Sequence, residues 1–201
     1  NKGEFLARRR SGVLDIVAGG RGDWTGWLEL EREPVDDTAM RMTARVVRDV
    51  GADVFGIVEA ENRPALKGFS DAILPLADGE PYAQVMLIDG NDPRGIDCAL
   101  MTRAGFPIAS MLSHVDDTDD AGLVFSRDCP EYRLDTRGGR LVVLVNHFKS
   151  KSGGSQASSD RKRRRQAAAV ARIYGRLREA GNGLVAVVGD LNDTPPENAD
   201  D

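Results

Sequence analysis

The sequence of 201 residues has few or none of the features that define several protein classes. It has only two cysteines, Cys98 and Cys129, which cannot form a disulfide framework and whose spacing does not suggest a metal site. Its longest unbroken apolar runs, such as 141–145, have five residues, whereas a membrane-spanning helix needs about 20. With 27 basic against 32 acidic residues, the net charge of −5 excludes a general basic attraction to nucleic acid. No signal-peptide pattern is visible, and because the chain begins at Asn1 rather than Met, its compartment stays open.

The residues that are present predict one soluble domain over 1–201. Hydrophobic residues make up 41% of the chain, and a globule of this size can bury a substantial core. Helices are expected at 37–50, 64–74 and 160–180, with Asp36, Asp37 or Thr38 capping the first and Asn62 the second. Strands are expected at 54–58, 84–88, 96–102, 107–114, 123–126, 132–135, 141–145 and 184–188. The first 35 residues, which are rich in glycine, read as a surface loop.

This order of elements predicts an α+β fold in which sheet packs on sheet and helices lie outside. Gly138-Gly139 marks a hairpin, so the middle strands should be largely antiparallel. The strand at 54–58 reads as buried on both faces. The apolar face of the last helix is predicted to consist of Ala167, Val170, Ala171, Tyr174 and Leu177.

Polar side chains follow three of the predicted strands, where each apolar run stops. Glu59 follows the first, residues 146–151 follow the second with His147 among them, and residues 189–193 follow the third with Asp190 and Asn192 among them. Polar groups gathered at one edge of a buried sheet are a common place for ligands to bind.

Each of these signals also has an ordinary structural explanation. A glutamate after a strand is usually a solvated loop residue, and an Asp-x-Asn sequence often caps a turn. His147 could be a core histidine, and the basic run 161–165 is usually the solvated face of a helix.

Together, five segments resemble the endonuclease/exonuclease/phosphatase superfamily, the deoxyribonuclease I-like fold, and in particular its bacterial members. These segments are ADVFGIVEAENR, RGIDCALMTR, LVVLVNHFKSK, RRRQAAAVARIY and VAVVGDLNDTP. The resemblance runs from about Asp53 to Pro195 within a motif-bearing core at about 37–195. It implies a four-layer α/β/β/α sandwich of two mixed, largely antiparallel sheets with outer helices.

The resemblance also implies roles for particular residues. Glu59 and Asp190 are expected to bind Mg²⁺ or Mn²⁺, which prefer hard oxygen ligands. Asp190 would also orient or activate the attacking water. His147, as imidazolium, would donate to the developing negative charge, and Asn192 would bind a phosphate oxygen. Lys149 and Arg94 are expected to bind phosphate.

The chain departs from the family pattern at its two ends. The family has an asparagine on its first strand and an aspartate–histidine pair near its end. Only two histidines occur here, and His114 in the middle of the chain is expected to be structural. We therefore expect a domain that is incomplete at both ends, with open sheet edges, and little or no activity from these residues alone.

The leading functional prediction is a Mg²⁺- or Mn²⁺-dependent hydrolase of phosphodiester bonds, with nucleic acid or another phosphate ester as its substrate. Residues 147–178 contain ten basic residues and one acid, which suits a polyanion. Three alternatives stay open: a non-catalytic phosphate- or polyanion-binding module of the same fold, a phosphatase or phospholipase acting on lipid or inositol phosphates, and an ordinary α/β domain with an accidental resemblance. The oligomeric state is not predicted.

Overall fold

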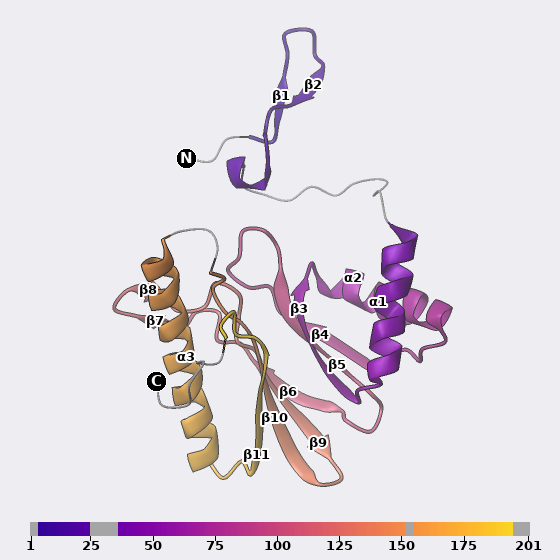
Figure 1. Cartoon of the computed structure of the whole chain (residues 1–201), viewed down its shortest axis with the longest axis vertical. Coiled ribbons are helices and arrows are strands. Elements are labelled where there is room, and N and C mark those ends of the chain that lie inside the picture. The colour runs from indigo at the N-terminus through magenta and orange to yellow at the C-terminus, as the bar shows by residue number, and fades with distance from the viewer. Residues whose placement is uncertain (1–3, 25–35, 152–154, 195–201) are drawn as a thin grey trace.

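The structure, a computed structural model, describes residues 4–24, 36–151 and 155–194. Its centre consists of two sheets (Figure 1). The first contains, in spatial order, β11 (Leu184–Asp190), β10 (Gly139–His147), β9 (Glu131–Thr136) and β6 (Ile108–Leu112). The second contains β3 (Val54–Ala60), β5 (Asp97–Thr102) and β4 (Gln84–Leu87). All neighbouring strands are antiparallel except β10 and β11, which are parallel.

Three helices and several short elements complete the described chain. The helices are α1 (Asp37–Val50), α2 (Arg63–Gly68) and α3 (Gln156–Glu179). A π-helical turn (Phe69–Ile73) and a 3-10 turn (Leu74–Ala77) follow α2, and another 3-10 turn spans Arg21–Asp23. Two small hairpins pair β1 (Leu6–Arg8) with β2 (Leu14–Ile16), and β7 (Thr118–Asp119) with β8 (Gly122–Leu123). Every described helix is too short or too polar to cross a membrane.

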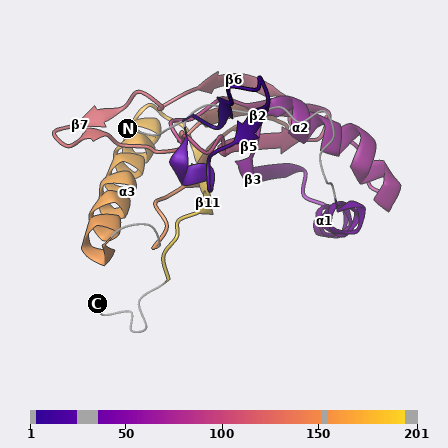
Figure 2. The same cartoon turned by 90° about the horizontal axis from the view of Figure 1, so that it is seen from above.

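The alternation of side chains along β10 explains the layers. Val142 and Leu144 point to one face, where they pack with α3, and Val143 and Val145 point to the other, where they meet the second sheet. On the far face of that sheet, Met101 of β5 packs against α1. The order is therefore helix, sheet, sheet, helix (Figure 2), which confirms the predicted α+β sandwich.

Capping residues set both ends of α1 and the start of α2, as the sequence predicts. Asp36 accepts hydrogen bonds from the first turn of α1, which ends at Gly51 in a left-handed conformation. Asn62 caps α2 through Ala65 N.

Four expectations were wrong in whole or in part. Residues 123–126 form no continuous strand, because Val124 and Phe125 enter the core from a loop. The single helix predicted at 64–74 is instead three helical pieces in succession: α2, the wider π-helical turn and the tighter 3-10 turn. The supposed surface loop at the start contains the β1–β2 hairpin. The buried face of α3 contains Gln166, Ala169, Val170, Ile173 and Leu177, so Ala167, Ala171 and Tyr174 are exposed instead.

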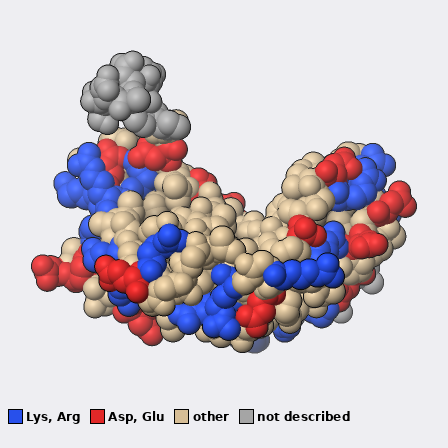
Figure 3. Space-filling view, turned by 90° about the horizontal axis from the view of Figure 1, so that it is seen from below, with Lys and Arg blue, Asp and Glu red and all other residues tan. Residues whose placement is uncertain are grey.

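The burial predicted for residues 54–58 was also wrong. Within the described residues, β3 and β11 are edge strands, and most residues of β3 are only half-buried. The two edges lie close together, since a Cβ atom at Gly56 would stand 3.1 Å from Val188. Leu184, Val187 and Val188 of β11 are exposed, and the space-filling view shows a hollowed surface whose floor is mostly uncharged (Figure 3).

Candidate active site

The carboxyl ends of β10 and β11 bring His147 and Asp190 side by side. The two strands are parallel and in register, with His147 opposite Asp190 and Asn146 opposite Gly189. Gly189 has a φ of 119°, and a Cβ atom there would overlap the carbonyl oxygen of Asn146. Only glycine allows this approach of the two backbones, so the Gly-Asp pair fixes the position of Asp190.

Glu59 reaches the same place from the edge of the second sheet. The pairing of β3 with β5 shifts register between Ile57 and Ala60, which is a β-bulge. Within the bulge Glu59 has a φ of 61°, a left-handed conformation that is costly for a side chain other than Gly, Asn or Asp. The bulge therefore turns Glu59 toward the end of β10 at a cost in backbone strain, which is common at functional sites.

His147 lies between the two carboxylates. Its Nε2 atom is 3.8 Å from Glu59 Oε1 and 4.0 Å from Asp190 Oδ2. Both distances are longer than a hydrogen bond, so the three groups face a shared space. The Glu59 and Asp190 side chains are 62% and 52% exposed, whereas that of His147 is 4% exposed.

Burial lowers the pKa of His147 below its usual value, and the charge of Arg127 lowers it further, whereas Glu59 and Asp190 act in the opposite direction. Burial therefore works against the imidazolium form expected from the sequence, and the role of His147 stays a prediction. A neutral ring still donates one hydrogen bond, and Nε2 is the nitrogen that faces the two carboxylates.

Asn192 holds the loops that follow the two strands. Its backbone N donates to Asp190 Oδ1 at 2.8 Å, and its side-chain Nδ2 donates to the carbonyl oxygen of Phe148 at 3.0 Å. Its φ of 54° is left-handed, which asparagine tolerates well. In this structure the side chain therefore bonds the residue after His147.

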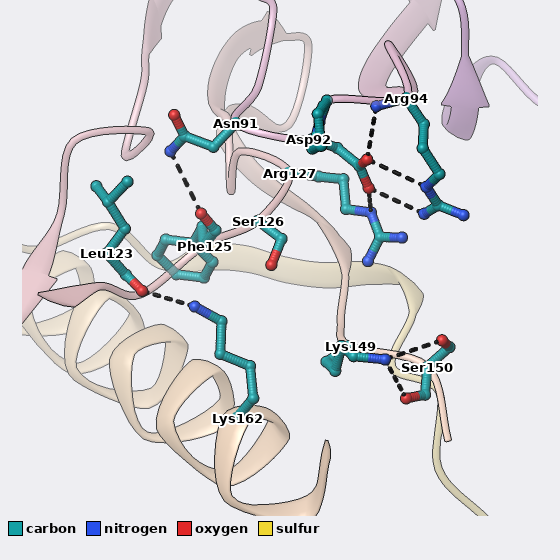
Figure 4. Close-up of a pocket in the computed structure, with 11 residues that line it drawn as sticks. Asn91, Asp92, Arg94, Leu123, Phe125, Ser126, Arg127, Lys149, Ser150 and Lys162 are labelled. Atoms are coloured by element: carbon teal, nitrogen blue, oxygen red, sulfur yellow. Dashed lines mark hydrogen bonds and ion pairs between the residues drawn. The ribbon is translucent and has the colours of Figure 1, made fainter. Parts of the chain in front are cut away.

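A cavity of about 490 Å³ is lined by four cations (Figure 4), of which Arg127 and Arg94 act electrostatically on His147. Two of them, Arg94 and Lys149, are the predicted phosphate ligands, and the other two are Arg127 and Lys162. Asp92 pairs with Arg94 and Arg127, with N–O distances of 2.9 Å in both pairs. One carboxylate thus orients two guanidinium groups at the cavity wall.

The cations also influence one another across this cavity. Burial lowers the pKa of Lys149, and the charges of Arg127, Arg163 and Arg94 lower it further. The Lys149 ammonium donates to Ser150 O at 2.9 Å and to Ser150 Oγ at 3.3 Å. A bound anion would relieve the mutual repulsion of these cations.

Sequence reasoning missed Arg127 as a site residue. Its side chain is buried, with 5% exposure, and it lies between the core residues Phe125 and Cys129. The available signal was a charged residue between nearby apolar ones, which indicates a buried cation with a partner elsewhere in the chain. The partner, Asp92, lies 35 positions earlier and could not be assigned from the sequence.

The donor chemistry of the site fits a divalent cation. Glu59 and Asp190 supply exposed carboxylate oxygens on either side of one space, and such hard ligands suit Mg²⁺ with water completing its shell. In the described part of the chain, no group of three or more His, Cys, Asp or Glu side chains is arranged to hold a metal ion. Among the described residues, Glu59 and Asp190 are the two carboxylates that lie about 4 Å from His147.

A family model described as the Endonuclease/Exonuclease/phosphatase family matches residues 17–200. The chain belongs to this family. No curated protein matches the sequence. Family members hydrolyse phosphate esters, which agrees with a site that places carboxylates beside cations.

Solved structures share the fold at low sequence identity. TDP2 from C. elegans is 15% identical with a TM-score of 0.56, and the match covers 80% of this chain and 46% of that one. The catalytic domain of human nocturnin with a bound sulfate anion is 16% identical, with a TM-score of 0.56 and coverage of 79% and 59%. Sphingomyelinase C from Streptomyces griseocarneus is 20% identical, with a TM-score of 0.52 and coverage of 80% and 60%. The chain therefore spans about half of the length of the structures it matches.

Proposed function

We propose that this chain carries the site of a divalent-metal-dependent phosphodiesterase in which Glu59 and Asp190 hold Mg²⁺ or Mn²⁺. The observation that carries the proposal is the convergence of Glu59, His147 and Asp190, from both sheets, beside the cationic cavity. Phosphate-ester hydrolysis needs positive charge at the phosphoryl oxygens and an activated water. The cations of the cavity can supply the positive charge, and the two carboxylates can hold the metal ion and orient the water.

Each residue takes a role that its position allows. The bound ion would neutralise charge on the phosphate and lower the pKa of a coordinated water. Asp190 orients the attacking water, and His147 donates from Nε2 to a phosphoryl oxygen. Lys149 and Arg94 bind the phosphate from the cavity, with Arg127 as a further cation. Asn192 bonds the loop that carries Lys149 and offers its remaining amide hydrogen to a phosphate oxygen.

Nucleic acid is the substrate class that we favour. The basic run at 161–165 is not wholly solvated, because Lys162 bonds Leu123 O, Arg163 is buried and Arg165 pairs with Asp119. Arg161 and Arg164 remain exposed on α3. Being three residues apart, they add exposed positive charge to one face of α3, and binding to a nucleic-acid backbone uses such charge.

The test is hydrolysis by the 201-residue chain with Mg²⁺, followed on fluorescently labelled single-stranded DNA, labelled RNA and sphingomyelin vesicles. In keeping with the little activity expected from these residues alone, we expect only slow cleavage of a nucleic acid, which a chelator abolishes and Glu59→Gln reduces to background. Faster cleavage of the vesicles would replace nucleic acid with a lipid phosphodiester as the substrate. Hydrolysis that survives both the chelator and Glu59→Gln would overturn the proposed function.

One observation favours a second candidate, a phosphate-binding module without catalysis. The cations of the cavity are held by ion pairs and hydrogen bonds, whereas no three-ligand metal cluster occurs in the ranges that the structure describes. A binding module would bind inorganic phosphate with equal affinity in the wild type and Glu59→Gln and would never require Mn²⁺. Mn²⁺-dependent binding or turnover would exclude it.

A further inference from the structure

Two side chains of α3 bind the peptide groups of Lys149, which lies two residues after His147. Gln166 Oε1 accepts a hydrogen bond from Lys149 N at 2.9 Å, and Arg163 Nη1 donates to Lys149 O at 3.1 Å. Being three residues apart, Arg163 and Gln166 share one face of the helix. Both are buried, with exposures of 5% and 0%. We name these two side chains the Arg163–Gln166 clamp.

The peptide groups of the preceding residue, Phe148, are held as well. Its N–H donates to Asp190 O at 2.9 Å, and its carbonyl accepts from Asn192 Nδ2 at 3.0 Å and from Arg127 Nη1 at 3.3 Å. Each backbone donor and acceptor of residues 148 and 149 therefore has a partner, which a buried irregular segment requires. The segment directly after His147 is fixed from both sides.

Arg163 also reaches the loop after β11. Its Nε atom lies 3.5 Å from Asp193 Oδ2, and Lys151 Nζ lies 3.0 Å from Asp193 Oδ1. A third contact joins Arg163 to Asp160 on its own helix. One buried cation thus links α3 to both loops that carry the candidate site residues.

The composition of this helix face argues that the clamp serves the site. Elsewhere α3 packs on the sheet through apolar residues, including Ala169, Val170 and Ile173. A buried guanidinium and a buried amide are costly unless they are bonded, and stability alone would be served as well by apolar side chains. The bonds they make go to the segment that positions Lys149 and His147.

We propose that Arg163 and Gln166 are positioning residues, which set where His147 and Lys149 stand relative to Asp190 without touching the substrate. The catalytic meaning of that placement rests on the proposed function. The placement itself is independent of metal and substrate, so it can be tested separately. Supporting groups around a site commonly change ligand affinity 10- to 100-fold when they are removed.

The test compares clamp variants with matched controls on the same helix. Gln166→Leu removes the acceptor for Lys149 N at similar volume, and Arg163→Lys keeps the charge but cannot serve Lys149 O and Asp193 together. Arg172→Met is the exposed-charge control. Leu177→Ala, in the same helix–sheet core, controls for lost stability, since it removes packing and leaves the clamp intact.

The first readout is the set of ¹H–¹³C imidazole signals at one fixed pH without metal. The chain has only two histidines, so His114 serves as an internal reference, and His147→Gln assigns the two signals. We expect the His147 signal to shift in Gln166→Leu and Arg163→Lys while the His114 signal stays in place. Neither control should move the His147 signal.

The second readout is binding of inorganic phosphate, which we expect to weaken about tenfold in the clamp variants. An unshifted His147 signal in both clamp variants would overturn the proposal. An equal shift in Leu177→Ala would also overturn it, because the effect would then follow stability. If Gln166→Leu fails to fold, Arg163→Lys decides alone. Failure of the proposed function would appear instead as a wild-type chain that binds no Mn²⁺.

Discussion

The two sides of the candidate site are built in opposite ways. On the cationic side, Arg127 and Arg163 are buried, and their partners include backbone carbonyls as well as carboxylates. On the acidic side, Glu59 and Asp190 are more than half exposed, and Glu59 stands in a strained bulge. The buried cations are held by partners within the chain, whereas the carboxylates are open to solvent.

This difference matches what each side would bind. Fixed cations cost no reorganisation when an anion arrives, which is the advantage of a preorganised site. A hydrated divalent ion instead needs accessible oxygens and keeps part of its water shell. The comparison predicts that substitution of a buried cation reduces stability as well as anion binding, whereas substitution on the acidic side mainly reduces metal binding.

The largest effect is expected for Arg127→Met. It leaves the buried Asp92 carboxylate with Arg94 alone and removes a donor to Phe148 O. Breaking a buried ion pair in this way costs about 3 kcal/mol of the free energy of unfolding. Arg94→Met, whose side chain is half exposed, should cost about 1 kcal/mol or less. Urea unfolding measures both, and equal costs would remove the distinction between the buried and exposed cations.

Asn192→Ala should cost about 2 kcal/mol. It removes the bond to Phe148 O, worth about 1 kcal/mol, and it places alanine in a left-handed conformation, which costs about 1 kcal/mol more. Asn192→Gly removes only the bond, so it should cost about half as much. A glycine variant as unstable as the alanine variant would show that backbone conformation is not part of the effect.

On the acidic side, Glu59→Gly should stabilise the protein while it removes metal binding. Relief of the left-handed strain at Glu59 is worth about 1–2 kcal/mol, partly offset by the greater unfolded-state freedom of glycine. The expected net gain is about 0.5–1 kcal/mol by urea unfolding. Glu59→Gln should leave stability unchanged, and a loss of stability in Glu59→Gly would contradict the strain at the bulge.

The smallest effect concerns Asp128, the neighbour of Arg127. Burial raises the pKa of this carboxyl group, although hydrogen bonds with Ser113, His114 N and Cys129 N oppose the shift. The folded state therefore binds the proton more tightly than the unfolded state, and stability falls as pH rises above the ordinary pKa of about 3.9. Asp128→Asn keeps the shape without the charge, so its gain in stability over the wild type should grow from pH 4 to pH 7. If the gain in stability shrinks between pH 4 and pH 7, the pKa of Asp128 is lowered by folding and the prediction is wrong.

Much of the fold was predictable from the sequence, because its strongest signals are local. The caps at Asp36 and Asn62 and the largely antiparallel middle strands depend on neighbouring residues. The burial of the strand at 54–58 was not predictable, since a strand's place in a sheet is a tertiary property. The same applies to Arg163, whose surroundings on α3 read as a solvated basic run until the loop after His147 packs on it.

The candidate site likewise contains residues that the sequence predicts and residues that it does not. Strand ends revealed Glu59, His147 and Asp190, because polar residues directly after apolar runs are visible in the sequence, and the structure brings these three together. Arg127 and Gln166 were missed because their partners, Asp92 and Lys149, are distant in the sequence. Long-range polar pairing leaves no periodic pattern to read.

The central claim is that the open, acidic side of the site holds a divalent cation. It is tested most directly by a Mn²⁺ titration followed by electron paramagnetic resonance, on the wild type, Glu59→Gln and Asp190→Asn. The account predicts saturable binding to the wild type that weakens at least 100-fold in each variant, with unchanged urea midpoints. Binding that is absent from the wild type, or that is equally tight in all three proteins, would contradict it.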